Sequence, residues 1–363
     1  MNQKISRREF AMLAGSGVVA IALGSPLLAK SAGAVSTPDA QMKAVLDELA
    51  SFNAPPIEKL SPMNARNNPT VADAVIGVLA KRRKPAVEMV GDVNHQLIPG
   101  PGGDLLARIY LPNGKGPFPV LVYFHGGGWV IANLDTYDSS CRALTNAANC
   151  IVVSVAYRQA PEHKFPAAAE DAYAATQWVI ANAARINGDP KQVAVGGESA
   201  GGNLAAVTCL MARDRAGKMP VHQILIYPVT NYAFDTPSYQ ENANAKPLNK
   251  AMMMWFWRQY LNSGSDGSNP YASPLRTENL RDLPPATVIT AEIDPLRSEG
   301  EAYAKRLREA GSPVKAINYN GVTHEFFGTG AVVDKAKQAV KEAAGGLRSG
   351  FMGNTSRATN EKS

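Results

Sequence analysis

The chain has 363 residues, of which 45% are hydrophobic and 19% are charged, so it can bury a large core as one domain or as a domain with an insertion. The formal net charge is +6, but residues 1–34 hold four basic residues and one acid, and the basic run at 81–84 is short. These values argue against a nucleic-acid partner. The three cysteines are too few for a disulfide framework, and their spacing does not suggest a metal site. We expect buried thiols, with a disulfide between Cys141 and Cys150 as the alternative.

The first 34 residues have the pattern of an export signal. A twin-arginine motif at 6–10 is followed by an apolar, glycine-containing run up to Ala29, and Ala32-Gly33-Ala34 fits a cleavage site. The pattern predicts a Tat signal peptide, and with it a periplasmic or secreted bacterial protein with no stable membrane partner after export. A retained membrane anchor is the alternative, which the glycines and Pro26 in the run disfavour.

Residues 35–85 show two amphipathic helical patterns separated by a connection rich in proline and asparagine. They contain nothing that suggests chemistry, so we interpret them as the N-terminal helices of a cap. The first part of an α/β core is then predicted from 86 to 229. It begins with a hairpin of two strands, at 87–98 and 105–111, whose turn is rich in proline and glycine.

A buried strand at 119–124 ends in His125-Gly126-Gly127-Gly128-Trp129. Consecutive glycines after a strand leave backbone N–H groups without side-chain cover, which an oxyanion hole requires. A flexible turn is the alternative, but it gives no role to the flanking His125 and Trp129.

Strands and helices then alternate, with helices predicted at 138–148 and 167–184 and strands at 150–155, 193–195 and 221–227. This alternation predicts an α/β fold with a mostly parallel sheet and helices on both faces. The turn at 157–166 follows a strand, and ligand sites gather at the carboxyl ends of such strands.

Gly197-Glu198-Ser199-Ala200-Gly201 lies between the strand at 193–195 and a helical pattern that continues to about Met211. A G-x-S-x-G sequence between a strand and a helix is typical of a nucleophile elbow, in which a tight turn lifts the serine hydroxyl above the sheet. A glycine-rich structural turn is the alternative, and the motif alone does not decide between them.

Residues 230–265 interrupt the alternation and concentrate large apolar side chains, including Met253 and Trp257. We expect this insertion both to pack on the first cap helices and to cover an apolar pocket. Trp129, Met253 and Trp257 are the predicted pocket residues.

The second part of the core is predicted at 266–348, with strands at 286–290 and 314–319, a helix at 299–310 and a closing helix at 331–344. The polar tail, 349–363, is predicted to be disordered.

A serine nucleophile needs a base and a third group that orients the base. In this fold the chain order is serine, acid, histidine, and only His222 and His324 follow Ser199. His222 begins the strand directly after the helix that follows Ser199, so no strand between the two could carry the acid. His324 lies beyond the last strand and is therefore the predicted base. Asp294, just after the preceding strand, is the predicted acid. Glu292 and Glu299 are interpreted as salt-bridged surface groups.

Five motifs in order, at 125–129, 157–166, 197–201, 294–296 and at His324, resemble the hormone-sensitive lipase family, whose bacterial branch consists of carboxylesterases. The resemblance covers about residues 40–345. It implies an eight-stranded α/β-hydrolase fold with a cap built from the N-terminal helices and the insertion. It also implies an oxyanion hole formed by the backbone N–H groups of Gly127, Gly128 and Ala200, with Gly126 holding the loop's shape.

The chain departs from this family at two positions. Glu198 stands where many relatives have Asp or Thr, and Glu325 follows His324 where Gly is usual. Both leave the triad intact, but they affect what can be inferred about the hydrogen bonds around it.

The function expected from these features is hydrolysis of short to medium acyl esters, through an acyl-enzyme and without metal or cofactor. An exported O-deacetylase and a lipase using the same triad are alternatives, and a ligand-binding protein that lost turnover is disfavoured because all three residues are present. A small-molecule ester is the expected partner. Relatives often pair through a sheet edge or a helix, which makes a homodimer an alternative to a monomer.

Overall fold

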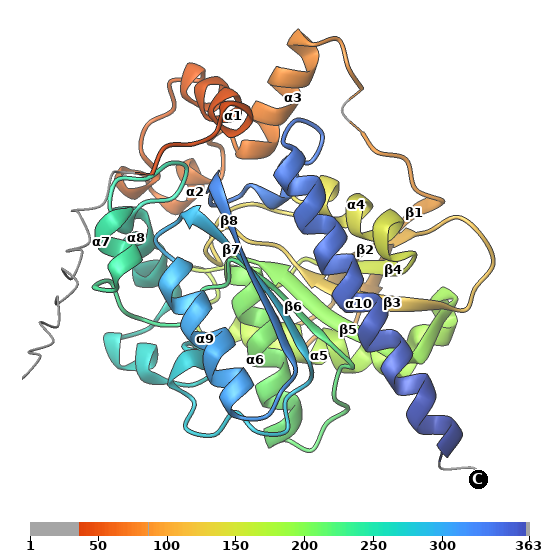
Figure 1. Ribbon diagram of the computed structural model, residues 1–363. Coiled ribbons are helices and arrows are strands. Elements are labelled where there is room, and N and C mark those ends of the chain that lie inside the picture. Colours follow the sequence, from red (N-terminus) through yellow and green to blue (C-terminus); the bar gives the residue numbers. More distant parts are fainter. Residues whose placement is uncertain (1–35, 86, 361–363) are drawn as a thin grey trace, which may run out of the picture. The chain divides into compact units, whose positions relative to one another are not determined.

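The computed structural model describes residues 36–85 and 87–360, with side chains up to Gly353 (Figure 1). The predicted signal peptide, 1–34, lies outside the described residues. Within them, no helix combines the length and the apolar character needed to cross a membrane. Cys141, Cys150 and Cys209 are buried free thiols.

One sheet forms the centre of the described chain, and its strand order is β1-β2-β4-β3-β5-β6-β7-β8. The first two pairings along this order are antiparallel and all later ones are parallel, which confirms the predicted eight-stranded, mostly parallel sheet. The strands are β1 (Asp92–Ile98), β2 (Leu105–Leu111), β3 (Phe118–Phe124), β4 (Ile151–Val155), β5 (Gly188–Glu198), β6 (Gln223–Ile226), β7 (Ala286–Ile293) and β8 (Val314–Thr323).

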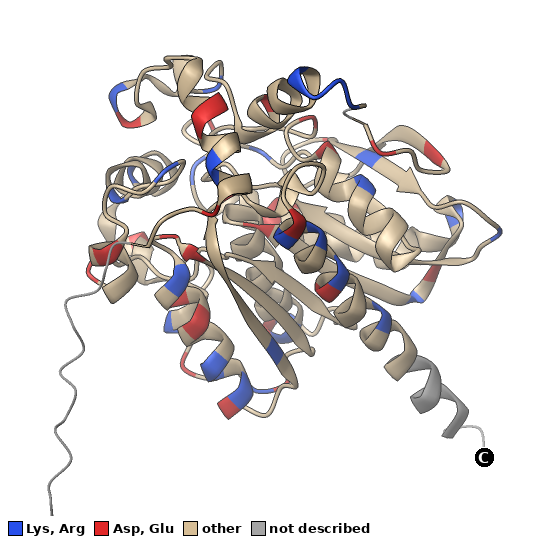
Figure 2. Ribbon diagram, turned by 45° about the horizontal axis from the view of Figure 1, so that its top comes forward, with Lys and Arg blue, Asp and Glu red and all other residues tan. Residues whose placement is uncertain are grey.

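Side-chain alternation along the central strands builds two apolar cores, one on each face of the sheet. In β3, Val120 and Val122 belong to one core, and Leu121 and Tyr123 to the other. Helices α5 (Ala167–Asn182), α6 (Ala200–Asp214) and α9 (Arg297–Glu309) cover the first face, while α4 (Asp138–Ala148) and α10 (Asp334–Asn360) cover the second (Figure 1). Lys, Arg, Asp and Glu are interspersed along α9 and α10 (Figure 2).

The cap comes from two separate segments at the carboxyl ends of the parallel strands (Figure 1). The N-terminal segment holds α1 (Ala40–Ser51), α2 (Pro62–Ala65) and α3 (Val71–Lys81), and the insertion holds α7 (Pro237–Glu241) and α8 (Lys250–Tyr260). Capping residues fix where these helices begin: Thr70 and Asp73 form a capping box on α3, and the Asn249 side chain accepts from the N–H of Met252 on α8. Short 3-10 turns complete the chain at η1 (Ile57–Lys59), η2 (Ala183–Ile186), η3 (Gly264–Ser268), η4 (Pro274–Arg276) and η5 (Phe327–Thr329).

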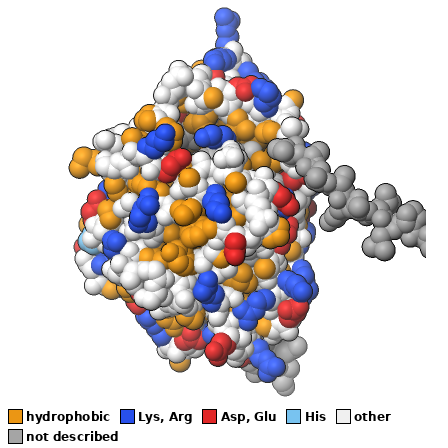
Figure 3. Space-filling model, turned by 90° about the vertical axis from the view of Figure 1, so that its left-hand side faces the viewer, with side chains coloured by type: hydrophobic (Ala, Val, Ile, Leu, Met, Phe, Trp, Pro, Cys, Tyr) orange, Lys and Arg blue, Asp and Glu red, His pale blue; other side chains and the backbone are white. Residues whose placement is uncertain are grey.

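On the side of α7 and α8, hydrophobic side chains gather in patches between separate Lys and Arg side chains (Figure 3). Met254 on α8 is among the large apolar residues that remain exposed. The insertion therefore presents apolar surface to solvent as well as to the interior.

The last helix is longer than the sequence pattern predicts. α10 continues through Asn360, so the prediction of a disordered tail from 349 was wrong for the described part of that segment. Leu347 and Phe351 extend the apolar face of the helix and are buried. Gly346, which weakens a helical pattern in sequence, is needed here because a Cβ would lie 2.1 Å from Thr287 Oγ1.

Candidate active site

Ser199 stands at a sharp turn between β5 and α6, with φ 56° and ψ −117°. Non-glycine residues rarely adopt positive φ, and the two flanking glycines make the turn sterically possible. A Cβ on Gly197 would lie 2.4 Å from the Phe124 carbonyl oxygen, and one on Gly201 would lie 1.9 Å from the same atom. The Ser199 N–H donates to the Ile226 carbonyl at 2.9 Å, which fixes the turn against β6.

His324 directly follows β8, and its side chain contacts Ser199. Its Nε2 lies 3.0 Å from Ser199 Oγ, and both side chains are buried. The ring packs on Tyr227, with 4.5 Å between ring centroids. His222, the other histidine after Ser199, precedes β6 and contacts Thr287 instead, with 3.0 Å between Nε2 and Oγ1.

Asp294 follows β7 and completes a hydrogen-bonded row of three side chains. Its Oδ2 lies 2.6 Å from His324 Nδ1, and its Oδ1 accepts from the Leu296 N–H at 2.8 Å. The structure thus brings together the three residues that the sequence analysis selected. With Nδ1–H donating to Asp294, Nε2 is left free to accept the serine proton.

Opposing effects act on the pKa of His324. Burial lowers it, but the Asp294 carboxylate and then the nearby Glu325 and Glu198 more than compensate, so the pKa of His324 is raised. The site therefore favours the imidazolium that forms when this histidine takes a proton.

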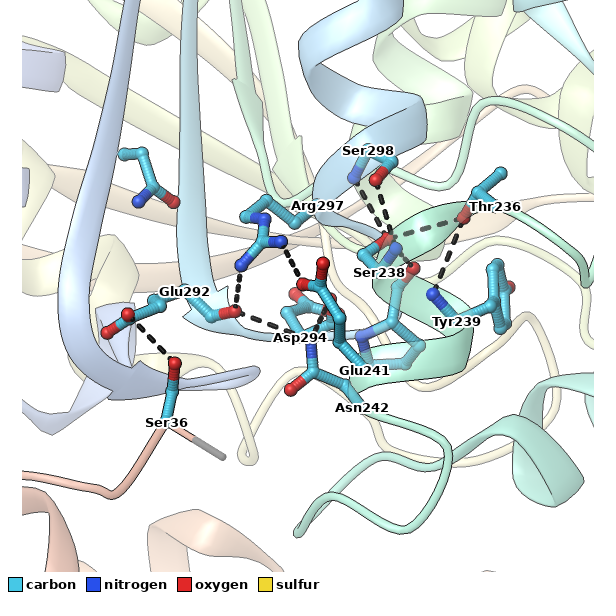
Figure 4. A network of polar contacts seen from close by, with 12 residues as sticks. Ser36, Thr236, Ser238, Tyr239, Glu241, Asn242, Glu292, Asp294, Arg297 and Ser298 are labelled. Atoms are coloured by element: carbon cyan, nitrogen blue, oxygen red, sulfur yellow. Dashed lines mark hydrogen bonds and ion pairs between the residues drawn. The ribbon is translucent and has the colours of Figure 1, made fainter. Parts of the chain in front are cut away.

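The cap insertion holds the loop that carries Asp294 (Figure 4). Ser238 Oγ on α7 donates to the Pro295 carbonyl at 2.6 Å, and its N–H and Oγ exchange hydrogen bonds with Ser298. The Asn242 side chain donates to the Asp294 carbonyl at 3.3 Å, and Arg297 pairs with Glu241. The position of the acid thus depends on α7.

Neither Glu292 nor Glu299 is the salt-bridged surface group that the sequence analysis expects. Glu292 is half-buried and accepts from Ser36 Oγ at 2.9 Å (Figure 4). It also accepts from the Gly321 N–H at 2.6 Å, which ties β7 to β8. Glu299 is buried and accepts from the N–H groups of Thr230 and Asn231. Burial raises the pKa of Glu299 well above its usual value. Both carboxyls hold chain segments beside the site.

The loop after β3 has a backbone conformation that favours glycine, and it lies beside Ser199. Gly127 and Gly128 have φ values of 89° and 58°, and a Cβ on Gly127 would lie 2.2 Å from the Ile131 carbonyl oxygen. Both glycines line the cavity that contains Ser199. Ala200 is the first residue of α6, so its N–H is one of the donors that a helix leaves unpaired at its start.

Contacts of Gly126 and His125 with two tyrosines hold the start of this loop in place. A Cβ on Gly126 would lie 2.2 Å from the hydroxyl of Tyr137, so only glycine fits there. His125 stacks on Tyr157 at 4.5 Å, and the Tyr157 hydroxyl donates to the His125 carbonyl at 2.9 Å. Burial lowers the pKa of His125 to about 4, so its ring is neutral near pH 7.

The turn at 157–166 supports the same loop through contacts that its sequence does not reveal. The Gln159 side chain donates to the carbonyls of Ile131 and Ala132, at 2.9 and 3.1 Å. Arg158 forms a bidentate ion pair with the fully buried Asp171 on α5. Asp171 gives no signal in sequence, because it cannot be distinguished there from a solvated helix acid such as its neighbour Glu170.

A cavity of about 560 Å³ opens above Ser199 between core and cap. Met253 lines it, as predicted, but Trp129 and Trp257 do not, and this part of the prediction is corrected. Trp129 has φ 61°, which turns its side chain into the core, where it stacks on Tyr260 at 4.1 Å between centroids and contacts Trp257. Met252 and Phe256 from the predicted lid segment also line it, and the lining residues that the sequence analysis did not single out include Leu46, Leu49, Ile57, Val71, Ile131, Tyr137 and Leu248.

Two further carboxyls stand against the triad. Glu198 is buried and accepts hydrogen bonds from the hydroxyls of Tyr123 and Tyr227. Burial, with the charge of Glu325, raises the pKa of Glu198 to about 7. Glu325 lines the cavity, and its Oε1 accepts from the Tyr137 hydroxyl at 2.7 Å. Among residues 36–85 and 87–360, no group of three or more His, Cys, Asp or Glu could hold a metal ion.

Comparison with known proteins identifies the family of the chain. A family model described as the alpha/beta hydrolase fold matches residues 121–328. The chain is 47% identical over 248 residues to the carboxylic ester hydrolase LipN of Mycobacterium tuberculosis, covering 67% of this chain and 66% of that protein. It is 35% identical over 243 residues to the ethyl acetate hydrolase of Pseudomonas putida, covering 66% and 76%.

Solved structures show the same arrangement over most of the chain. A thermostable esterase from Pseudomonas putida matches with a TM-score of 0.80 and 37% identity, covering 88% of this chain and 99% of that one. A hyperthermophilic esterase from the archaeon Pyrobaculum calidifontis matches with a TM-score of 0.79 and 40% identity, covering 86% and 98%.

Proposed function

The chain belongs to the alpha/beta hydrolase fold family, in its hormone-sensitive lipase-like branch, and from this we propose that it hydrolyses carboxylic esters with Ser199 as the nucleophile. The observation that carries the proposal is the hydrogen-bonded row from Ser199 Oγ through His324 to Asp294, at 3.0 and 2.6 Å. Such a row turns a weakly nucleophilic hydroxyl into one that can attack a carbonyl.

The reaction proceeds in two halves. Ser199 Oγ attacks the ester carbonyl while Nε2 of His324 takes its proton, and Asp294 holds the imidazole and stabilises its cation. Nε2 then gives the proton to the leaving alcohol oxygen, which completes the acyl-enzyme. In the second half, Nε2 takes a proton from water, which attacks the acyl carbon and releases the acid as the proton returns to Ser199.

The N–H groups of Gly127, Gly128 and Ala200 are assigned to the oxyanion of both tetrahedral intermediates. Each such donor is worth on the order of 10²–10³ in rate, because it is aimed in advance at charge that develops only in the transition state. Gly128 sits under the Phe256 ring, so the cap shields this hole from water.

The size and lining of the cavity support small esters as substrates. A volume of about 560 Å³ accommodates a short to medium acyl chain together with an alcohol group, and most lining side chains are apolar. An O-deacetylase or a lipase with the same triad would differ in substrate and not in chemistry. The enclosing cap favours the small ester over a long lipid chain.

The test is a series of p-nitrophenyl esters from acetyl to palmitoyl, with kcat/KM measured for wild type and Ser199→Ala. We expect a maximum at short or medium chains and activity near background in the variant. Ser349→Ala, at an exposed serine on α10, is the matched control and should keep full activity. Retained turnover in a folded Ser199→Ala protein would overturn the proposal.

We also propose that residues 1–34 export the folded protein through the Tat route. Support comes from the twin-arginine motif and the cleavage site in the sequence. Replacing both Arg7 and Arg8 by lysine should leave active enzyme in the cytoplasm of a bacterial host, whereas unchanged periplasmic activity would contradict the proposal.

A further inference from the structure

Glu325 occupies a backbone position that disfavours its residue type. Its φ is 67°, in the left-handed region where glycine is readily accommodated and other residues are strained. A side chain kept against this cost points to a contribution that glycine would not make.

The Glu325 carboxyl faces the nitrogen of His324 that handles the proton. Its Oε1 lies 3.8 Å from His324 Nε2, on the opposite side of the ring from Asp294, and the residue lines the cavity beside Ser199. The same oxygen accepts from the Tyr137 hydroxyl at 2.7 Å. Tyr137 in turn packs against Gly126, so Glu325 is fixed to the oxyanion loop.

Among the charged groups around Glu325, His324 is the one that can pair with it as a cation. Within the described residues, the ion pair recorded for Glu325 is the one with His324. Asp294 from the end of β7 and Glu198 from β5 add negative charge, and Tyr123 and Tyr227 hydrogen-bond to Glu198. On the cap side, Arg66 is paired with Glu162, while Glu58 and Lys246 line the outer cavity.

We propose that Glu325 is a positioning residue for ester hydrolysis, whose carboxylate stabilises protonated His324 from the Nε2 side. An opposite charge at about 4 Å favours the protonated imidazole that exists in each half-reaction. Glu325 takes no proton: the proton moves from Ser199 or water to Nε2 and from there to the leaving group. The inference rests on the function proposed above and adds a second carboxylate to the triad.

The raised pKa of His324, to which Glu325 contributes after Asp294, is consistent with this role. Burial also raises the pKa of Glu325 itself, which the nearby His324 cation and Tyr137 oppose. The His324 cation and the Tyr137 hydroxyl thus favour the ionised form of Glu325, on which this role depends.

Three variants separate the charge from the mechanical link. Glu325→Gln keeps the shape and an oxygen that can accept from Tyr137, but it removes the charge. Glu325→Gly removes the charge and also the backbone strain at positive φ. It is the variant to measure if Glu325→Gln does not fold. Tyr137→Phe keeps the charge and removes the link. Glu301→Gln, at an exposed position on α9, is the control for losing a carboxylate elsewhere.

The readout is the acid limb of the pH profile of kcat/KM, which reports the free-enzyme base. We expect the limb to move to lower pH by about one unit in Glu325→Gln and Glu325→Gly, and not in Tyr137→Phe or Glu301→Gln. A limb that stays in place, or moves up, in both Glu325 variants would overturn the inference.

A second readout does not depend on turnover. The imidazole pKa of His324, followed by NMR of ¹⁵N-histidine-labelled protein, should fall by a similar amount in Glu325→Gln, and an unchanged value would overturn the inference. A protein that hydrolyses no ester would refute the proposed function while leaving this titration able to decide the role of Glu325.

Discussion

The ring of Phe256 on cap helix α8 lies directly over Gly128 of the oxyanion loop. A Cβ built on Gly128 would stand 2.3 Å from Phe256 Cδ1, closer than two carbon atoms can approach. Cap and core therefore meet at the backbone that is assigned to bind the oxyanion, and a small change there affects both.

Gly128→Ala is expected to lower kcat by about 10² or more, because the methyl group displaces either the loop N–H or the cap helix. Its positive φ adds backbone strain. The measurement is kcat on p-nitrophenyl acetate, with folding checked by circular dichroism. Gly345→Ala, at a helical position where a Cβ meets nothing within 4 Å, is the control and should be fully active. Equal kcat for both variants would contradict the close packing of Phe256 on this loop.

Met253→Ala is expected to shift the preferred acyl chain to greater length, since it removes a side chain that lines the cavity. The ratio of kcat/KM for the octanoate and acetate esters should rise several-fold. Met254 on the same helix is exposed, so Met254→Ala should leave the ratio unchanged. If the two variants give the same ratio, this side of the cavity does not hold the acyl chain.

Glu198→Gln is expected to flatten the pH dependence of stability. The folded pKa of Glu198 is about 7, above the ordinary value of 4.5, so the folded state holds this proton more tightly than the unfolded state does. The stabilisation is therefore full below about pH 4.5 and is lost as the pH rises through 7. Melting temperatures from pH 5 to 8 should fall less in the variant than in wild type, with Glu301→Gln behaving like wild type. Parallel curves for all three proteins would contradict the assignment.

Asp171→Ala is expected to destabilise the fold by about 3 kcal/mol, at the low end for a broken buried ion pair because Arg158 is partly exposed. The control is Asp47→Ala, which breaks the exposed pair with Lys43 and should cost about 0.5 kcal/mol or less. Urea unfolding of both variants measures the difference. Similar losses for the two would mean that Arg158 finds another partner.

Phe351→Ala is expected to cost about 3–5 kcal/mol, because this ring is buried beneath the extended part of α10. Met352, its neighbour in sequence, is exposed, and Met352→Ala should change stability by less than about 0.5 kcal/mol. Thermal unfolding distinguishes the two. A Phe351 variant as stable as wild type would show that the helix ends earlier in solution.

The parts that sequence predicts well are those with a local signal. The buried strand before Gly126, the G-x-S-x-G turn and the order of Ser199, Asp294 and His324 each follow from short-range steric or chemical rules. The structure places these residues at one edge of the sheet, as parallel strands require.

The parts that sequence predicts poorly depend on contacts between distant segments. Sequence predicts Trp129 in the pocket, but the residue has positive φ and stacks on Tyr260, which follows it by more than a hundred residues. Gly346 weakens a helical pattern in sequence, and its use becomes clear only beside Thr287. Glu299 resembles any helix-surface acid until the backbone of Thr230 is placed against it.

The hydrogen bonds from α7 to the Asp294 loop have a consequence for how such enzymes diversify. The segment that roofs the substrate also braces the catalytic acid, through Ser238, Asn242 and Glu241 (Figure 4). A chimaera that imports the insertion of a relative would acquire its chain-length preference only if it also imported these polar anchors. A graft that brings the insertion without these anchors should therefore give a protein that folds well but turns over slowly.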